Sequence, residues 1–351
     1  MNQNISELCK DPLFQLNLAI WLAQPQPKEF YVYPLFFESG LSIYSLSPLL
    51  ALPVDIRLSV SKKLDCQEAV RPDLILKGKN PKKFCILECK VSSFSQSSST
   101  ARQARTLLLI AGPLILEVLA VGKRGASDSL LCYFSNSNQI TGLEETLNVL
   151  TKEIVTANLE PGIYGCFGIK PNQSEILLEY SDKIKKFLYL LKDAPVKILD
   201  VEKDTDPRPL YFIPYDPNLQ QKTEEQQLCR RILFERILSY IVSTIGGATI
   251  PSSVIIKMEE LLSSATFGLY EVWDDSESKK YVRRLVKDFL SNIKSSINEP
   301  LKEFITYEAQ KGWIFNLKDK ETFEEMQKQI MKFKPETLDL SKKIEPTLFD
   351  Y

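Results

Sequence analysis

The stretch Arg71–Val91, RPDLILKGKNPKKFCILECKV, decides the fold of the first half of this chain. It holds two short segments of strand character, Pro72–Lys77 and Phe84–Val91, joined by the turn sequence GKNP at residues 78–81. Segments of this kind on either side of a cluster of Gly, Asn and Pro are typical of a β-hairpin. We therefore expect two antiparallel strands here.

Period-2 alternation puts Glu88 and Lys90 on one face of the second strand, together with Phe84 and Ile86. Burying these two charges is costly unless they are paired or bind an ion. The hairpin brings Asp73 of the first strand close to Glu88. Two adjacent carboxylates repel each other, and a hard divalent cation such as Mg²⁺ or Mn²⁺ relieves that repulsion. The pattern predicts a metal site.

Pro72-Asp73 followed by Glu88-Cys89-Lys90 resembles the signature of the PD-(D/E)xK nuclease superfamily, over roughly residues 55–150. The resemblance implies that Asp73 and Glu88 hold Mg²⁺ or Mn²⁺ with the backbone carbonyl of Cys89. It also implies that Lys90 orients or activates the attacking water. A helix with a polar residue facing the site often follows the lysine strand in this family. Residues 99–110 fit that place, and Gln103 is the candidate.

Basic residues cluster near these positions. The hairpin turn carries Lys79, Lys82 and Lys83, and the following helix carries Arg102 and Arg105 beside Gln103. Lysines on a hairpin either form a solvated edge that blocks strand pairing or contact phosphates. Next to a metal site we take all five as candidate nucleic-acid contacts. Three further acids are weaker candidates for auxiliary metal ligands and are more simply surface acids: Glu7, Glu38 and Glu68.

Composition narrows the class of protein. The chain has 351 residues, 44 basic and 45 acidic side chains, and a hydrophobic fraction of 44%, so two or three ordered domains are expected. The absence of histidine excludes Ser-His-Asp, Cys-His and HNH-type chemistry. Seven scattered cysteines indicate reduced thiols of a cytoplasmic protein. No run approaches the ~20 apolar residues of a membrane span, so no membrane partner is expected.

Strand and helix patterns alternate from about residue 55 to 180, which favours an α/β fold. The resemblance specifies a restriction-endonuclease-like mixed sheet flanked by helices. We therefore predict four regions in the chain: an N-terminal helix and strand extension at 1–54, the nuclease-like core at 55–200, a proline-rich linker at 201–222, and a mostly α-helical C-terminal domain at 223–351.

Individual elements are also predicted. Strands are expected at Phe30–Phe37, Asp55–Val60 and Leu114–Val121, and helices at residues 5–24, Pro251–Leu262 and Leu301–Gln310. A long amphipathic helix is expected from about Ser276 to Ile297, with a basic face. GWIFNL at residues 312–317 is a possible strand, so these helices and a short hairpin resemble a winged helix.

Three functions remain open. The first is a Mg²⁺-dependent nuclease acting on nucleic acid, with DNA favoured over RNA, serving antiphage defence or restriction under control of a protein partner or as a homo-oligomer. The second is a catalytically silent nuclease-like scaffold or DNA-binding subunit of a larger complex. The third is a winged-helix DNA-binding module whose binding depends on Arg283 and Arg284. Three charged residues meeting on apolar strands favour the first.

Overall fold

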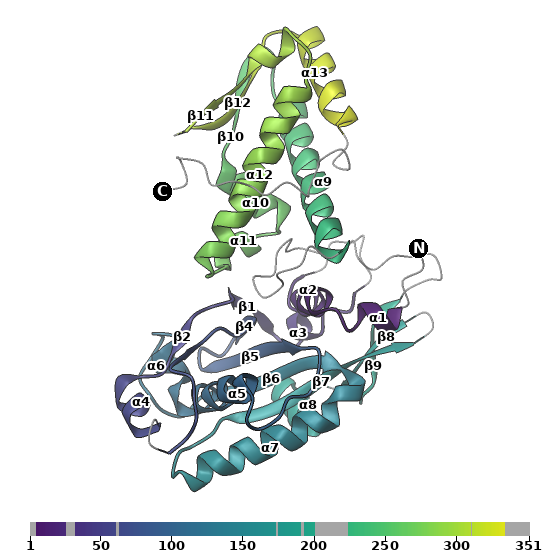
Figure 1. The fold of residues 1–351 in the computed structure, drawn as a ribbon. Helices are drawn as coiled ribbons and strands as arrows, with labels where there is room; N and C mark the ends of the chain where they lie inside the picture. The colour runs from purple at the N-terminus through teal and green to yellow at the C-terminus, as the bar shows by residue number, and fades with distance from the viewer. Residues whose placement is uncertain are drawn as a thin grey trace. The chain divides into compact units, whose positions relative to one another are not determined.

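The computed structural model describes residues 5–25, 32–60, 63–172, 175–190, 193–200, 224–309 and 311–333. The chain divides into two compact units (Figure 1). Unit 1 comprises Met1–Leu210 and Val272–Asp275, and unit 2 comprises Tyr211–Glu271 and Ser276–Tyr351. The predicted linker at 201–222 lies outside the described residues.

Unit 1 is built on a seven-stranded mixed sheet flanked by helices, so the predicted α/β class is confirmed. The strand order is β1-β4-β5-β6-β7-β8-β9. The strands span β1 Leu41–Leu46, β4 Leu74–Gly78, β5 Lys83–Lys90, β6 Asp128–Asn136, β7 Ile163–Asn172, β8 Glu175–Tyr180 and β9 Val196–Asp200. The pairs β5–β6 and β6–β7 are parallel, and the other neighbouring pairs are antiparallel.

The hairpin predicted from residues 71–91 is confirmed as β4 and β5. Its antiparallel register pairs Leu74 with Leu87 and Lys77 with Phe84. β5 is central: it pairs with β4 on one side and with β6 on the other. A strand covered on both faces and paired on both edges must be almost wholly apolar, which explains the sequence FCIL at residues 84–87.

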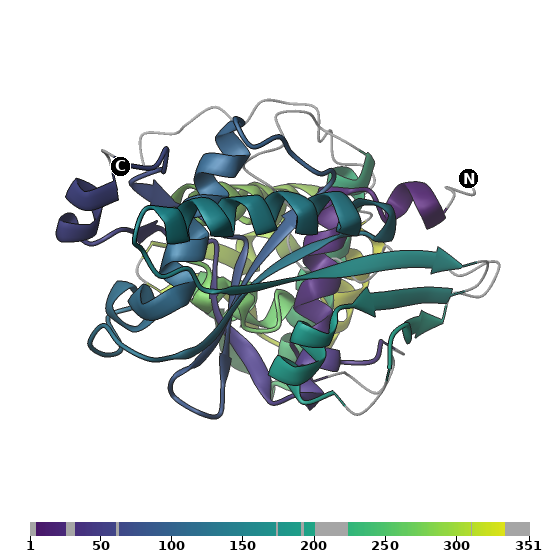
Figure 2. The same ribbon diagram turned by 90° about the horizontal axis from the view of Figure 1, so that it is seen from below.

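Helices cover both faces of the sheet (Figure 2). On one face, α5 (Ser99–Leu109) and α7 (Ile140–Thr156) pack over β5 and β6, and the core there includes Phe84, Ile86 and Leu107. On the other face α2 (Pro12–Leu22) contacts β5 and β6. Both sides of the strand that carries Glu88 are therefore shielded from water.

Three predicted strands of unit 1 are helical instead. Residues 54–60 form α4 because Pro53 and Asp55 supply a helix start, and β1 already occupies the sheet edge beside β4. Residues 115–118 form α6, which follows a π-helical turn at Ile110–Leu114 that is kinked at Gly112. Leu35–Glu38 forms α3, which covers the last three residues of the predicted strand 30–37, and residues 30–31 of that strand are not described.

The remaining elements of unit 1 are short. The helix predicted at 5–24 is present as α1 (Ile5–Leu8) and α2, because Asp11 caps a new helix by accepting from the amide of Phe14 at 2.8 Å. α8 spans Asp182–Leu188, and β2 (Leu50–Ala51) pairs with β3 (Ala69–Val70).

Unit 2 combines helices with a three-stranded antiparallel sheet of order β10-β12-β11. Its elements are α9 Glu224–Gly246, β10 Ser252–Ile256, α10 Met258–Ala265, α11 Leu269–Val272, α12 Ser276–Ser296, β11 Ile305–Glu308, β12 Gly312–Leu317 and α13 Lys320–Lys332. The predicted helices at 251–262 and 301–310 are therefore partly wrong. β10 pairs with β12, and this partner distant in sequence overrides the local helix pattern at residues 252–256. β11 pairs with β12 as the neighbouring strand of a hairpin.

Among the residues that the structure describes, no helix is both long enough and apolar enough to cross a lipid bilayer.

Candidate active site

The two acids of the hairpin meet at one end of the β4–β5 ladder. Continuing the register by one pair places Asp73 directly opposite Glu88. The Asp73 amide donates to Glu88 Oε2 at 3.3 Å, and the Cys89 amide donates to Asp73 Oδ2 at 2.6 Å. The hairpin therefore brings the two acids together.

Glu88 is buried and fully engaged. Only 3% of the residue is exposed. Its Oε1 atom lies 2.7 Å from Lys90 Nζ and accepts from Gln103 Nε2 at 2.9 Å. A carboxylate out of water needs such partners, since desolvation penalises its charged form. The ion pair therefore joins a buried carboxylate to a partly exposed lysine, so it is not a solvated surface pair.

Lys90 stands at the mouth of this cluster, with 23% of its side chain exposed. Burial opposes its charged form, but the negative charges of Glu88 and Asp73 and the hydrogen bond to Glu88 raise the pKa of the ammonium above its ordinary value. Its backbone is also fixed, because the Ser135 hydroxyl donates to the Lys90 carbonyl at 2.5 Å. The side chain is held as a cation beside two carboxylates.

The oxygen atoms at this point suit a hard cation. Asp73 and Glu88 supply carboxylates, and the Cys89 carbonyl faces the same strand edge as its amide, which bonds Asp73. Across the described part of the chain, no group of three or more His, Cys, Asp or Glu side chains could hold a metal. Two carboxylates, one carbonyl and several waters match the needs of Mg²⁺, which keeps much of its hydration shell. The donor set therefore fits the expected metal.

Gln103 reaches the site from α5. Ser98 caps this helix by accepting from the Ala101 amide at 3.1 Å, which fixes where the helix starts. Gln103 then links β5 to the segment that precedes β4: its amide nitrogen lies 2.9 Å from Glu88 Oε1 and 3.5 Å from the carbonyl of Arg71. The structure thus brings together all four predicted catalytic residues: Asp73, Glu88, Lys90 and Gln103.

Tyr133 is a fifth polar group at the site, and it was not predicted. It lies on β6, paired with Glu88 across the parallel ladder, and is fully buried. Its hydroxyl has no hydrogen-bond partner among the described residues. Burial, followed by the charges of Glu88, Cys166 and Asp73, raises the pKa of this phenol well above its usual value. In sequence Tyr133 stands in an apolar run, and only the β5–β6 register identifies it.

The predicted nucleic-acid contacts lie in two different places. Lys79 and Lys82 are exposed at the β4–β5 turn, the opposite end of the hairpin from the acids. The six residue-to-residue steps from Asp73 to Lys79 span roughly 20 Å of extended chain. Lys83 is buried, donates to the Phe187 carbonyl, and lies 4.3 Å from the ring centroid of Tyr189. Burial lowers the pKa of Lys83.

Each of the two arginines of α5 forms an ion pair with an acidic side chain. Arg102 lies 2.8 Å from Asp65 Oδ1 on the surface. Arg105 is buried and donates to Glu153 at 2.8 Å, to the Asp65 carbonyl at 3.3 Å and to the Gln96 carbonyl at 3.0 Å. Arg105 thus ties α5 to α7 and to two loops, which is a structural role.

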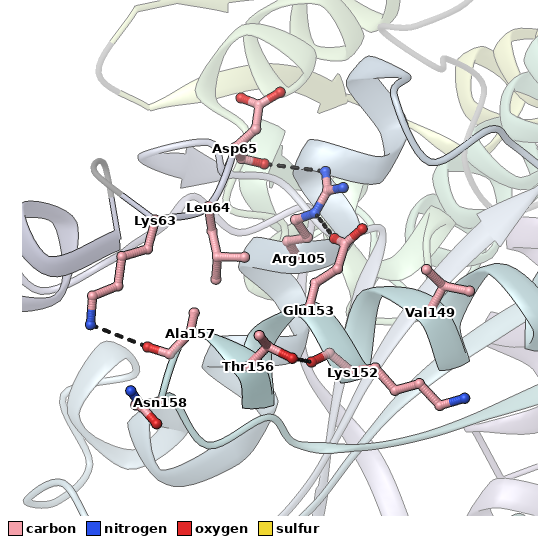
Figure 3. A pocket seen from close by; sticks show the side chains of 10 residues that line it. All are labelled: Lys63, Leu64, Asp65, Arg105, Val149, Lys152, Glu153, Thr156, Ala157 and Asn158. Carbon is pink, nitrogen blue, oxygen red and sulfur yellow. Dashed lines mark hydrogen bonds and ion pairs between the residues drawn. The ribbon is translucent and has the colours of Figure 1, made fainter.

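Arg105 also lines a shallow hollow between α7 and the loop at residues 63–65 (Figure 3). In this view its guanidinium points toward Glu153 and Asp65, and Lys63 Nζ donates to the Ala157 carbonyl at 3.2 Å. None of the four predicted catalytic residues lines the hollow.

The three acids considered as auxiliary metal ligands lie elsewhere. Glu7 pairs with Lys10 and Glu68 with Arg57, while Glu38 ends α3 at the surface.

Comparison of the chain with protein-family models, with curated proteins and with solved structures finds no match.

Proposed function

We propose that unit 1 is a metal-dependent nuclease with a restriction-endonuclease-like fold, which hydrolyses phosphodiester bonds of DNA. One observation carries the proposal: Asp73 and Glu88 face each other across two strands, and Lys90 and Gln103 both bind the buried Glu88 carboxylate. Structural ion pairs seldom need two acids, a lysine and a glutamine at the end of a central strand.

Each residue has a role in hydrolysis. Asp73, Glu88 and the Cys89 carbonyl would hold Mg²⁺ or Mn²⁺, which polarises the phosphate and acidifies a bound water. Water attacks phosphorus, a new P–O bond forms, and the P–O bond to the leaving sugar oxygen breaks. The water proton passes to solvent, and the leaving oxygen takes up a proton. Lys90 supplies positive charge where negative charge develops on the phosphate oxygens, and Gln103 orients the Glu88 carboxylate.

The test is cleavage of a plasmid in Mg²⁺ or Mn²⁺ by wild type, Lys90→Ala and Lys170→Ala. Lys170 is a matched control, because it lies on strand β7 and pairs with Glu179 at the same 2.7 Å, but on the surface. We expect cleavage by wild type and Lys170→Ala, loss of cleavage in EDTA, and a loss of about 100-fold or more in Lys90→Ala. Equal cleavage by both variants would show that the nuclease assignment is wrong.

A second candidate, a catalytically silent scaffold, is favoured by one observation: both oxygens of Glu88 already have donors without a metal. Calorimetric titration of Mn²⁺ separates the two. A nuclease site binds Mn²⁺ in wild type and in Glu179→Gln, but not in Glu88→Gln. A scaffold gives no site-specific heat in any of the three proteins.

A further inference from the structure

Helix α12 of unit 2 carries a stripe of positive charge. Lys280, Arg283, Arg284 and Lys287 follow the spacing i, i+3, i+4, i+7, so they share one face of the helix. Lys294 lies seven residues beyond Lys287 and extends the same face. The helix carries only two acids, Glu277 and Asp288. With a rise of 1.5 Å per residue, the stripe is roughly 20 Å long.

The opposite face of α12 is committed to the core of unit 2. Its buried residues include Val282, Leu285 and Phe289, and Phe289 stacks on Phe234 of α9 at a centroid distance of 4.1 Å. Phe333 packs against the same ring from beyond α13, with centroids 5.6 Å apart. The helix is therefore fixed in rotation, and the basic stripe is held on the outside.

The stripe is only partly neutralised by neighbouring acids. Arg283 pairs with Glu259 of α10 at 2.6 Å, and Lys280 pairs with Glu277 at 3.2 Å. Over the described residues, Arg284 and Lys294 form no ion pair. Exposed pairs of this kind contribute at most about 1 kcal/mol, so an anionic partner can compete for these side chains.

The surrounding elements have the order of a winged helix-turn-helix. α9 is followed by β10, the helices α10, α11 and α12, and then the hairpin of β11 and β12, with β12 between β10 and β11. α12 is thus the long helix that ends the helix-turn-helix. In such arrangements this helix enters the major groove of DNA. The topology and the charge stripe are independent observations that select the same helix.

We propose that unit 2 binds double-stranded DNA, with the basic face of α12 in the major groove. Three alternatives fit less well. A membrane surface requires apolar side chains beside the basic ones, and those of α12 are buried. Single strands are held by stacking on aromatic rings, and the stripe has none. Duplex RNA has a major groove too narrow for a helix.

DNA binding by α12 would deliver duplex substrate to the site of unit 1, and this delivery role rests on the proposed nuclease function. The binding itself does not. We expect this binding to depend little on the base sequence of the duplex, because contacts between basic side chains and phosphates dominate the affinity.

The test is fluorescence anisotropy of the full chain with a labelled duplex of about 20 base pairs in EDTA, over a range of salt concentrations. The variant Arg284→Gln/Lys287→Gln neutralises the stripe, and Lys320→Gln/Lys328→Gln neutralises two exposed lysines of α13 as a matched control. We expect the first variant to bind at least about 10-fold more weakly, with a salt slope shallower by about 2. The control should bind like wild type.

The outcomes separate this proposal from the nuclease proposal, because EDTA removes cleavage from the measurement. Duplex binding without cleavage in Mg²⁺ upholds the role of α12 and contradicts the nuclease. No duplex binding, equal loss in both charge variants, or preference for anionic vesicles or an acidic protein over duplex DNA would overturn the role of α12.

Discussion

Asp73 and Glu88 are each held in place by a backbone amide of the segment that carries the other. The Asp73 amide donates to Glu88 at 3.3 Å, while Asp73 accepts from the Cys89 amide next to Glu88 at 2.6 Å. Each carboxylate is thus bound by the strand that carries the other. This reciprocal arrangement fixes both side chains before any ligand arrives, so a metal would find its two acidic ligands preorganised.

The neutral amide of Gln103 keeps a third negative charge away from the Glu88 carboxylate. Gln103→Glu would place a third carboxylate within about 3 Å of Glu88, and like charges at that distance repel strongly. We expect a lower melting temperature without metal and a larger rise in melting temperature on adding Mn²⁺ than in wild type. Thermal unfolding with and without Mn²⁺ checks this, with the uncharged Gln103→Met as control. An identical Mn²⁺ response in all three proteins would contradict a metal site beside Gln103.

Tyr133→Phe removes a buried hydroxyl that has no partner. Leaving such a group out of water without a hydrogen bond costs about 1–3 kcal/mol, so its removal should raise the free energy of unfolding by roughly 1 kcal/mol. Urea unfolding of the two proteins measures the difference. A variant that is less stable than wild type by more than about 1 kcal/mol would show that the hydroxyl bonds to a group in the folded protein.

Arg105 and Arg102 on the same helix should differ sharply in their effect on stability. Arg105→Ala leaves Glu153 half-buried without its partner and removes the donor to two loop carbonyls, so we expect a loss of about 3 kcal/mol. Arg102→Ala breaks a surface pair with Asp65 and should cost less than about 1 kcal/mol. Urea unfolding compares them. Equal losses would mean that Arg105 is not a structural residue and would restore it as a candidate nucleic-acid contact.

Alkaline pH should destabilise unit 1 through Cys9. Burial raises the pKa of this thiol to about 12, whereas a thiol in the unfolded chain titrates near 8.5. Above about pH 9 the unfolded chain has lost this proton and the folded chain has kept it. Stability therefore falls with rising pH, by about 1.4 kcal/mol per pH unit for this one group, until the folded pKa is reached.

The measurement for Cys9 is the slope of unfolding free energy against pH between about 9.5 and 11, in wild type and in Cys9→Ala. Any cavity left by Cys9→Ala lowers stability equally at all pH values, so only the slope is diagnostic. We expect the variant to have the shallower slope. Parallel slopes would mean that Cys9 titrates in the folded chain as it does in the unfolded one.

The sequence alone determined the hairpin of β4 and β5 and the four residues that meet at its end. Strand alternation sets the face of Glu88 and Lys90, and the turn at residues 78–81 sets the register that places Asp73 opposite Glu88. The amphipathic pattern of residues 276–297 likewise predicted α12 and its basic face. These features depend on neighbours along the chain, and local patterns report such neighbours well.

Only the tertiary structure decided the rest. Residues 55–60 alternate like a strand but form α4, because β1 fills the edge beside β4. Residues 252–256 form β10 because β12 pairs with them from some sixty residues away along the chain. Tyr133 joins the site, and Arg105 is taken up by Glu153, through contacts between elements distant in sequence. Strand pairing and buried polar contacts between distant segments form only when the chain folds, so a local sequence pattern cannot predict them.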